Sequence, residues 1–380
     1  MSEHKYLGLK AELLTEGVWA TPDALKGVGS EYKEQNHGLF GWDFEDHAGI
    51  SLPDDFLLPD GTVVQFRKKS RSPYQVIADK DDLILTNGKE NICEVQWIKR
   101  PAYYSLQTSS HNTMVKIGQI GGEDCLFFCY QNYCSHFSKK EECLFCNLVS
   151  TSKTYNSVLK RKDTEDIGEV AKAAFAEGMV RHVLLTGGCF NHEKEIGLVG
   201  EILKSIRKHA GLDRVPGTIL PSPAKSIDDV KKYYDTGIKA IGFSMEIWDK
   251  KLYEAICPGK SKSVSHEAFI NSIRCAVKIF GAGNVYGVFV MGLEPKQTFL
   301  EGVREITELG ANVVPFVWSP NPGSKLQGHR PPTSAWFVET ALEAADIVHD
   351  ANIPPGTENH CYKCDGNSLL HDALRLKGIE

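Results

Sequence analysis

From about residue 115 onward, short apolar runs alternate with longer segments in which apolar residues recur every three or four positions. The short runs predict buried strands of a parallel sheet, and the periodic segments predict amphipathic helices. The expected strands cover residues 116–120 with 125–130, 182–188, 217–222, 238–247, 284–294 and 312–318. The expected helices cover residues 166–178, 195–210, 227–237, 266–281, 298–310 and 334–353.

Repeated strand–helix units predict an α/β fold, a full or partial TIM-type barrel of six to eight (β/α) units over residues 113–352. In such barrels the chemistry sits at the C-terminal ends of the strands. Residues 1–112 instead contain short β-like runs separated by Gly, Pro, Asp and Asn, which predict a small, mostly β domain. Residues 353–380 are expected to form a cysteine-containing tail.

Composition narrows the classes of function. The 380-residue chain carries a formal net charge of −6 and no long run of Lys or Arg, which disfavours binding to nucleic acid or an anionic membrane. No apolar stretch predicts a membrane span, and the first residues lack the apolar core of an export signal. We therefore expect a cytoplasmic protein with a small-molecule or carrier-protein-bound substrate. In a reducing compartment, its 11 cysteines indicate metal or cluster ligation more than disulfides.

Three cysteines follow the first expected strand with the spacing C-x8-C-x2-C: Cys134, Cys143 and Cys146. Three thiolates can hold three irons of a [4Fe–4S] cluster and leave the fourth iron open to a substrate or cofactor. The alternative is a zinc ion in a cage of four thiolates, with Cys125 or Cys129 as the fourth ligand. The spacing is a poor match to the paired CxxC knuckles of zinc ribbons, so it favours the cluster.

Other unusual residues also stand at the expected strand ends. Gly187 and Gly188 permit a backbone to approach a ligand closely, although a plain turn explains them equally well. Glu246 is an acid at the end of an apolar strand, where burial requires a partner such as a ligand, Lys250 or Lys251. Cys189, by contrast, is interpreted as a small buried residue, with a position facing the substrate as the alternative, and Cys257 as a residue that fills the core.

The triad, which ends in CLFC, and the order of these strand ends resemble the radical S-adenosylmethionine (SAM) superfamily. The resemblance implies that Cys134, Cys143 and Cys146 hold a [4Fe–4S] cluster whose open iron binds SAM. The SAM contacts that it implies are Gly187, Gly188, Glu246, Gly292 and Glu294.

Residues 315–326 are similar to the sixth-strand element of the biotin synthase and lipoyl synthase branch of that superfamily. One departure is the spacing, since the superfamily's usual motif is C-x3-C-x2-C and this chain has five more residues in the first interval. Longer loops cost little closure entropy, so the cluster remains the expectation.

A second pair of thiols, Cys361 and Cys364, forms a CxxC motif after the barrel. These thiols could hold an auxiliary iron–sulfur cluster or a zinc ion, or act as a redox dithiol, and their spacing does not choose among these. The resemblance to lipoyl synthase implies that an auxiliary cluster would serve as a sulfur donor.

The expected function is therefore reductive cleavage of SAM to a 5′-deoxyadenosyl radical, which abstracts hydrogen from a substrate. The electron is expected from a reduced flavodoxin or ferredoxin. With a sacrificial tail cluster the outcome is sulfur insertion, and without one it is rearrangement, methylation or C–C bond formation. The alternative from another class is a zinc-stabilised binding protein on the same barrel.

Overall fold

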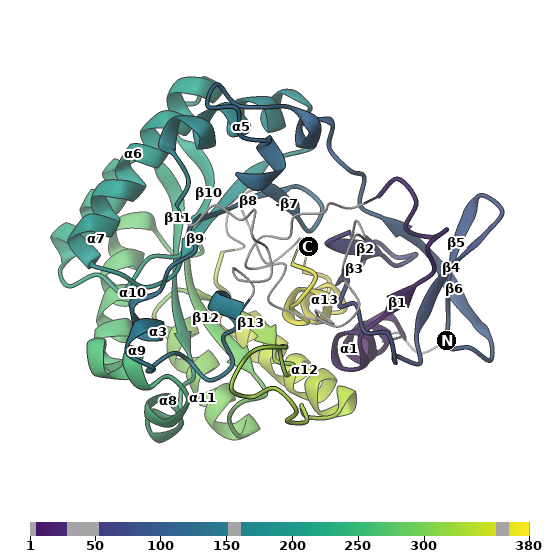
Figure 1. Ribbon diagram of the computed structural model, residues 1–380. Coiled ribbons are helices and arrows are strands. Elements are labelled where there is room, and N and C mark those ends of the chain that lie inside the picture. Colours follow the sequence, from purple (N-terminus) through teal and green to yellow (C-terminus); the bar gives the residue numbers. More distant parts are fainter. Residues whose placement is uncertain (1–4, 29–52, 151–160, 355–364, 380) are drawn as a thin grey trace.

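The computed structural model describes residues 5–28, 53–150, 161–354 and 365–379, and its centre is a curled 7-stranded sheet (Figure 1). The sheet has the order β13-β12-β11-β10-β9-β8-β7. Each strand from β8 to β13 is parallel to its neighbours in that series, and β7 pairs antiparallel with β8. The strands are β7 (Gln119–Gly121), β8 (Cys125–Gln131), β9 (His182–Gly187), β10 (Val215–Ile219), β11 (Ile238–Glu246), β12 (Val285–Met291) and β13 (Asn312–Val317). This arrangement confirms the α/β fold and shows a partial barrel.

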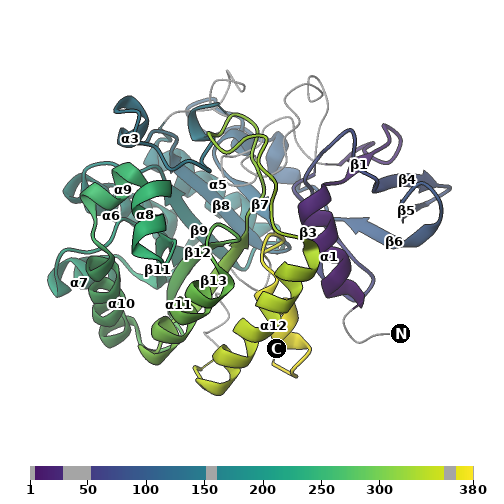
Figure 2. The same cartoon turned by 90° about the horizontal axis from the view of Figure 1, so that it is seen from below.

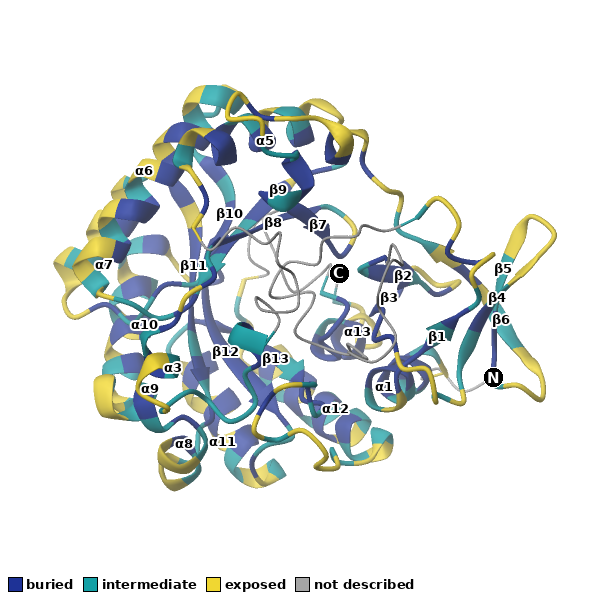
Figure 3. Cartoon of the chain, viewed as in Figure 1, coloured by how far each residue is buried: buried dark blue, intermediate teal, exposed yellow. Residues whose placement is uncertain are grey.

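Helices follow the parallel strands and cover the outer face of the sheet (Figure 1). They are α5 (Thr164–Ala176), α6 (His192–Ala210), α7 (Ile227–Asp235), α10 (His266–Phe280), α11 (Lys296–Glu308) and α12 (Ser334–Asp350). Several begin where a polar side chain accepts a backbone N–H of the first turn, as Asp163, Asn191 and Ser226 do. Their inner faces and the strands form the main core, whereas their outer faces are exposed (Figure 3).

The N-terminal part forms a second, 6-stranded sheet with the order β1-β4-β5-β6-β2-β3. Its strands are β1 (Trp19–Ala20), β2 (Asp55–Leu57), β3 (Val63–Gln65), β4 (Gln75–Asp79), β5 (Asp82–Thr86) and β6 (Asn91–Trp97). A helix, α1 (Lys5–Glu16), precedes the sheet where the sequence indicated no helix. Leu7 and Leu14 of α1 pack into the barrel core, and Leu9 and Leu13 pack into the core of the N-terminal sheet. The helix therefore joins the two cores, and it lies beside α12 (Figure 2).

The two edge strands of the partial barrel, β7 and β13, do not pair with each other in the described sheet. Strands β2 and β3 and helix α13 (Leu370–Arg375) lie between them (Figure 1). Ser368 forms an antiparallel bridge with Phe316 of β13, and Asp55 of β2 accepts the N–H of Gly122 at 2.8 Å. Segments that precede and follow the barrel in the sequence thus close the gap between β7 and β13, which is the seam of the barrel.

The buried guanidinium of Arg67 holds these closing segments together. Arg67 donates to the backbone oxygen of Val317 at 2.9 Å and also to the oxygens of Leu14 and the Asn367 side chain. One guanidinium therefore ties together α1, β13 and the segment before α13. In the part of the chain described here, no helix combines the length and the apolar character needed to cross a membrane.

Candidate active site

The open centre of the barrel contains a cavity of about 890 Å³ that receives the ends of the parallel strands. Part of its lining is apolar and includes Val288, Val290 and Phe316. Another part is polar and includes Asp55, Gln65 and Asn367 from the segments that close the seam. The cavity also receives several residues that the sequence singled out, namely Cys134, Cys143, Cys146, Gly187, Gly188 and Glu246.

Backbone hydrogen bonds fasten the loop that carries the three cysteines to Ile256 and to the segment after β13. After a short helix, α3 (Ser135–Ser138), the loop donates the Leu144 N–H to the oxygen of Ile256 at 2.8 Å. The Leu326 N–H, in the segment after β13, donates to the oxygen of Leu144 at 3.1 Å. The loop is therefore held from two sides above the cavity.

The additional residues between Cys134 and Cys143 attach the cysteine loop to two neighbouring segments. Glu141 pairs with Lys262 at 2.5 Å, and Glu142 pairs with Lys325 at 3.1 Å. Lys262 belongs to α9 (Pro258–Ser263), and Lys325 lies beyond β13. Together with α3, the additional residues fold the loop back onto these two segments.

The three motif thiols face one cavity but do not form the ligand shell of a single ion. The described residues contain one group of three metal-ligating side chains whose ligand atoms lie within 4.8 Å of one another, and it is Cys134, His136 and Cys189. Thiolates on one zinc lie about 3.8 Å apart, given Zn–S bonds of about 2.3 Å and tetrahedral angles. The ligand atoms of Cys134, Cys143 and Cys146 do not all lie within 4.8 Å of one another. Neither Cys125 nor Cys129 gathers a cage with them in the described chain.

The electrostatics of the motif thiols differ. Burial, together with a negative charge on Cys143, raises the pKa of Cys146 to about 12. A hydrogen bond from Cys189 lowers the pKa of Cys134 and outweighs burial. Of these two thiols, Cys134 is therefore the one that the protein alone favours as a thiolate, whereas Cys146 needs a positively charged metal to lose its proton.

The glycines at the end of β9 make room for the cysteine loop itself. A side chain on Gly188 would place its Cβ 2.2 Å from the oxygen of Tyr133 and 2.9 Å from the Cβ of Cys134. On Gly187 it would meet the ring of Tyr130 at 3.0 Å. The close backbone approach expected at these glycines is thus made by the chain's own loop, and both glycines also line the cavity.

Glu246 ends β11 in the left-handed conformation, with φ of 72°, and its carboxylate pairs with Lys260 at 2.5 Å. Lys260 also donates to the oxygen of Ser244 at 3.0 Å. Burial lowers the pKa of Lys260, but the charges of Glu246 and nearby thiols raise it, with a net pKa above its ordinary value. The partner is therefore neither Lys250 nor Lys251, and the ion pair forms part of the cavity wall.

Gly292 and Glu294 are not among the residues that line this cavity. Gly292, with φ of 107°, packs against the ring of Phe337 in α12. Glu294 accepts the N–H groups of Trp248 at 2.8 Å and Asp249 at 2.9 Å, just before α8 (Lys250–Ile256). Its carboxylate therefore orders the turn that follows β11.

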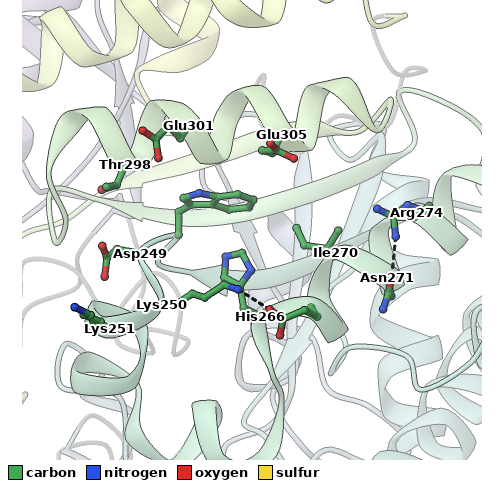
Figure 4. A pocket seen from close by; sticks show the side chains of 12 residues that line it. Asp249, Lys250, Lys251, His266, Ile270, Asn271, Arg274, Thr298, Glu301 and Glu305 are labelled. Carbon is green, nitrogen blue, oxygen red and sulfur yellow. Dashed lines mark hydrogen bonds and ion pairs between the residues drawn. The ribbon is translucent and has the colours of Figure 1, made fainter.

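That turn forms part of a second hollow, an open groove of about 750 Å³ between α8, α10 and α11 (Figure 4). The rings of Trp248 and His266 meet edge to face at its centre, 4.5 Å apart. Glu301 and Glu305 line the groove from α11. Lys250 lines it from α8, and Arg274 lines it from α10. The groove lies outside the barrel and contains none of the predicted site residues.

Two cysteines that the sequence assigned to the core lie beside the motif. Cys189 directly follows Gly188 and lines the cavity next to Cys134. Cys257 joins α8 to α9, and its thiol is hydrogen-bonded to Cys143. The position of Cys189 after a strand-end glycine pair was a usable signal, whereas nothing local marked Cys257.

The predicted auxiliary pair, Cys361 and Cys364, lies outside the described residues. The chain that follows is described, and Asp365, Gly366 and Asn367 line the cavity.

Residues 129–306 match the radical SAM superfamily. The chain is also 26% identical over 254 residues to bacteriochlorophyllide c C-7(1)-hydroxylase of Chlorobaculum limnaeum. That alignment covers 63% of this chain and 63% of the relative, less than two thirds of its length.

Similar solved structures include methylornithine synthase, with a TM-score of 0.43, 17% identity, and coverage of 68% of this chain and 83% of that chain. They also include the FeFe-hydrogenase maturase HydG from Carboxydothermus hydrogenoformans, with a TM-score of 0.47, 16% identity, and coverage of 67% and 56%.

Proposed function

Because residues 129–306 match the radical SAM superfamily, we propose that the chain is a radical SAM enzyme that binds a [4Fe–4S] cluster through Cys134, Cys143 and Cys146. When bound, the cluster and SAM supply a 5′-deoxyadenosyl radical that removes a hydrogen atom from the substrate. The observation that carries this proposal is that all three motif thiols line one cavity together with the strand ends of the barrel. The match of residues 129–306, which include the motif, to the radical SAM superfamily disfavours the zinc-stabilised binding protein.

The chain's own residues would orient SAM and exclude water. The Glu246–Lys260 pair lies on the cavity wall with side chains only 13% and 11% exposed, so it offers both signs of charge to the amino and carboxylate groups of SAM. Gly187 and Gly188 leave their backbone open to the cavity. Water excluded from this chamber cannot quench a reactive intermediate.

The cavity indicates the class of substrate. A lining that combines apolar strand residues with Asp55, Gln65 and Asn367 from the seam suits a large, mainly apolar molecule with a polar end. The relative of 26% identity is named as a hydroxylase of a chlorophyll-type macrocycle, which fits this description. We therefore propose that the reaction functionalises an unactivated C–H bond of such a substrate, with a reduced flavodoxin or ferredoxin as electron donor.

Sulfur insertion, as in the biotin and lipoyl synthase branch, is the second candidate. It is favoured by the position of Asp365, which lines the cavity and directly follows Cys364 in the chain. If Cys361 and Cys364 bind an auxiliary cluster, wild-type protein will contain about eight irons, and the double variant Cys361→Ala, Cys364→Ala will contain about four. Equal iron contents would remove this candidate and leave chemistry that needs one cluster.

The main proposal is tested on protein purified and reconstituted without oxygen. Wild type should be brown and should form 5′-deoxyadenosine from SAM in the presence of dithionite. Cys143→Ala and Cys146→Ala should each lose the cluster and this activity, because each removes one of three ligands. The matched control is Cys275→Ala on α10, outside the cavity-lining residues. Colourless wild type with stoichiometric zinc, or full activity in either variant, would contradict the proposal.

A further inference from the structure

Two thiols outside the cysteine motif each touch a thiol within it. The Sγ atoms of Cys134 and Cys189 and a ring nitrogen of His136 all lie within 4.8 Å of one another. Cys189 therefore lies within reach of a hydrogen bond to Cys134, and Cys257 lies in the same way beside Cys143. Two of the three proposed cluster ligands, Cys134 and Cys143, therefore each have one neighbouring thiol from outside the motif.

The position of Cys189 is set by the loop that it supports. Its backbone oxygen accepts the N–H of Ser135 at 2.9 Å, and Gly188 before it allows the loop to approach. Cys134 begins the α3 turn as the residue before Ser135, so the same contact fixes the two thiols side by side. Displacing Cys189 would require moving the loop that carries the motif.

Backbone hydrogen bonds also hold Cys257 in place. It is fully buried at the junction of α8 and α9, and its N–H donates to the oxygen of Tyr253 at 2.8 Å. Its neighbour Ile256 accepts the N–H of Leu144, the residue after Cys143. Cys257 is not among the cavity-lining residues, so it is not placed to contact a substrate.

We propose that Cys189 and Cys257 are positioning residues that donate S–H hydrogen bonds to the thiolates of Cys134 and Cys143 and thereby ease reduction of the cluster. The inference rests on the proposed function. Hydrogen bonds to the sulfurs of an iron–sulfur cluster are one determinant of its reduction potential. A donor stabilises the state with more negative charge on its acceptor, and that state is the reduced cluster. Loss of the donors should therefore make the cluster harder to reduce.

The contacts fit a donor role better than further ligation. Three motif thiols already leave one iron for SAM, and a fourth thiolate ligand would occupy that iron. Cys257 lies beside Cys143 but is not among the cavity-lining residues, so a hydrogen bond from it can form without competing with SAM.

The experiment compares Cys189→Ala and Cys257→Ala with wild type and with Cys275→Ala as a matched control, all reconstituted without oxygen. Iron content and the reduction potential of the cluster are measured, the latter by redox titration followed by electron paramagnetic resonance. We expect unchanged iron content and more negative potentials in both variants. The double variant should shift the one-electron equilibrium about tenfold, equivalent to about 59 mV.

Cys189→Ser and Cys257→Ser test the donor itself, since a hydroxyl can still donate a hydrogen bond. The serine variants should recover part of the potential, which a role in packing alone would not predict. Unchanged potentials in both alanine variants would overturn the inference while leaving the proposed function intact. Loss of iron in either variant would also overturn it, because the residue would then be a ligand. Wild type without a cluster would overturn both proposals.

Discussion

At Gly188 the end of β9 and the cysteine-bearing loop touch backbone to backbone. The space that a Cβ would need is occupied by the oxygen of Tyr133, at 2.2 Å, and backbone cannot rotate away as a flexible side chain can. Gly188 has no left-handed φ angle, so the requirement for glycine is one of room and not of conformation. The glycine thus fixes how closely Cys134 approaches the strand ends.

Gly188→Ala should therefore displace the loop and lower both iron content and thermal stability, by an amount typical of overpacking, about 1–3 kcal/mol. The control is Gly197→Ala in α6, where a Cβ meets nothing within 4 Å. That variant should gain about 0.5–1 kcal/mol, because alanine is the better helix former. The measurements are iron per chain and calorimetric unfolding. A Gly188→Ala protein with full iron content and unchanged stability would contradict this prediction, because the loop could then move away from β9 without a loss of stability.

Residues predicted from sequence were those marked by local spacing. The three motif cysteines and the glycine pair at 187–188 were named from their order along the chain, and the structure brings them to one cavity. The partner of Glu246 could not be named, because Lys260 is 14 residues away and reaches it only through α9. Cys257 was missed for the same reason, since its contact with Cys143 exists only in three dimensions.

Among the elements, α5 and α6 are joined at their exposed edges by one carboxylate. Glu165 of α5 accepts from Lys208 and from His209 of α6, each at 2.9 Å. The hydrogen bond from His209, followed by that from Lys208, lowers the pKa of Glu165 to about 2 from an ordinary 4.5. Because the folded state holds the ionised form, this contribution is present above about pH 4.5 and is lost as the pH falls toward 2.

Glu165→Gln should accordingly be less stable than wild type at neutral pH, with a difference that shrinks below pH 4.5 and vanishes near pH 2. Urea midpoints measured across that pH range give the result. Glu201→Gln, an exposed position on α6, is the control and should show little pH-dependent difference. A constant difference between Glu165→Gln and wild type would mean that the carboxylate's charge is not what matters.

Elements with one strong period were predicted well, and α1 was not. The helices and parallel strands after residue 160 each bury one face or a continuous apolar run, which gives a clear pattern. In α1 the apolar residues serve two cores, with Leu7 and Leu14 on one side and Leu9 and Leu13 on the other. Apolar positions spread around a short helix blur the helical period, so the sequence signal was lost.

At the scale of the molecule, a buried ion pair connects the N-terminal helix to the segment that closes the barrel. Lys10 of α1 lies 2.7 Å from Asp372 of α13, with side chains 2% and 8% exposed. Lys10 also donates to the oxygen of Asp365. The N-terminal sheet and the barrel are therefore expected to unfold together.

Lys10→Met leaves the Asp372 carboxylate buried without its partner and should cost about 3–5 kcal/mol, and the double variant Lys10→Met, Asp372→Leu should recover most of that loss. Urea unfolding can be followed in proteins that keep only Trp97, in the N-terminal sheet, or only Trp318, beyond β13. Both signals should shift by the same amount. A shift in one signal alone would show that the two parts unfold independently.

Closure of the barrel was beyond sequence reasoning for a related reason. A partial barrel was within the prediction, but the identity of the segments in its seam depends on Arg67 and Ser368, which are 301 positions apart and carry no mark of their role. Pairings over such distances leave no periodic signal.

The seam also imposes an order on synthesis. A chain is made from its N-terminus, and domains generally begin to fold in that direction. Here β2, β3 and Arg67 emerge from the ribosome long before Asn367 and α13, so the seam can close only after the whole barrel sequence has been translated. Until then β13 presents an uncovered sheet edge, and such edges favour aggregation. Iron loading is therefore best timed after α13, which ends at Arg375, has been translated.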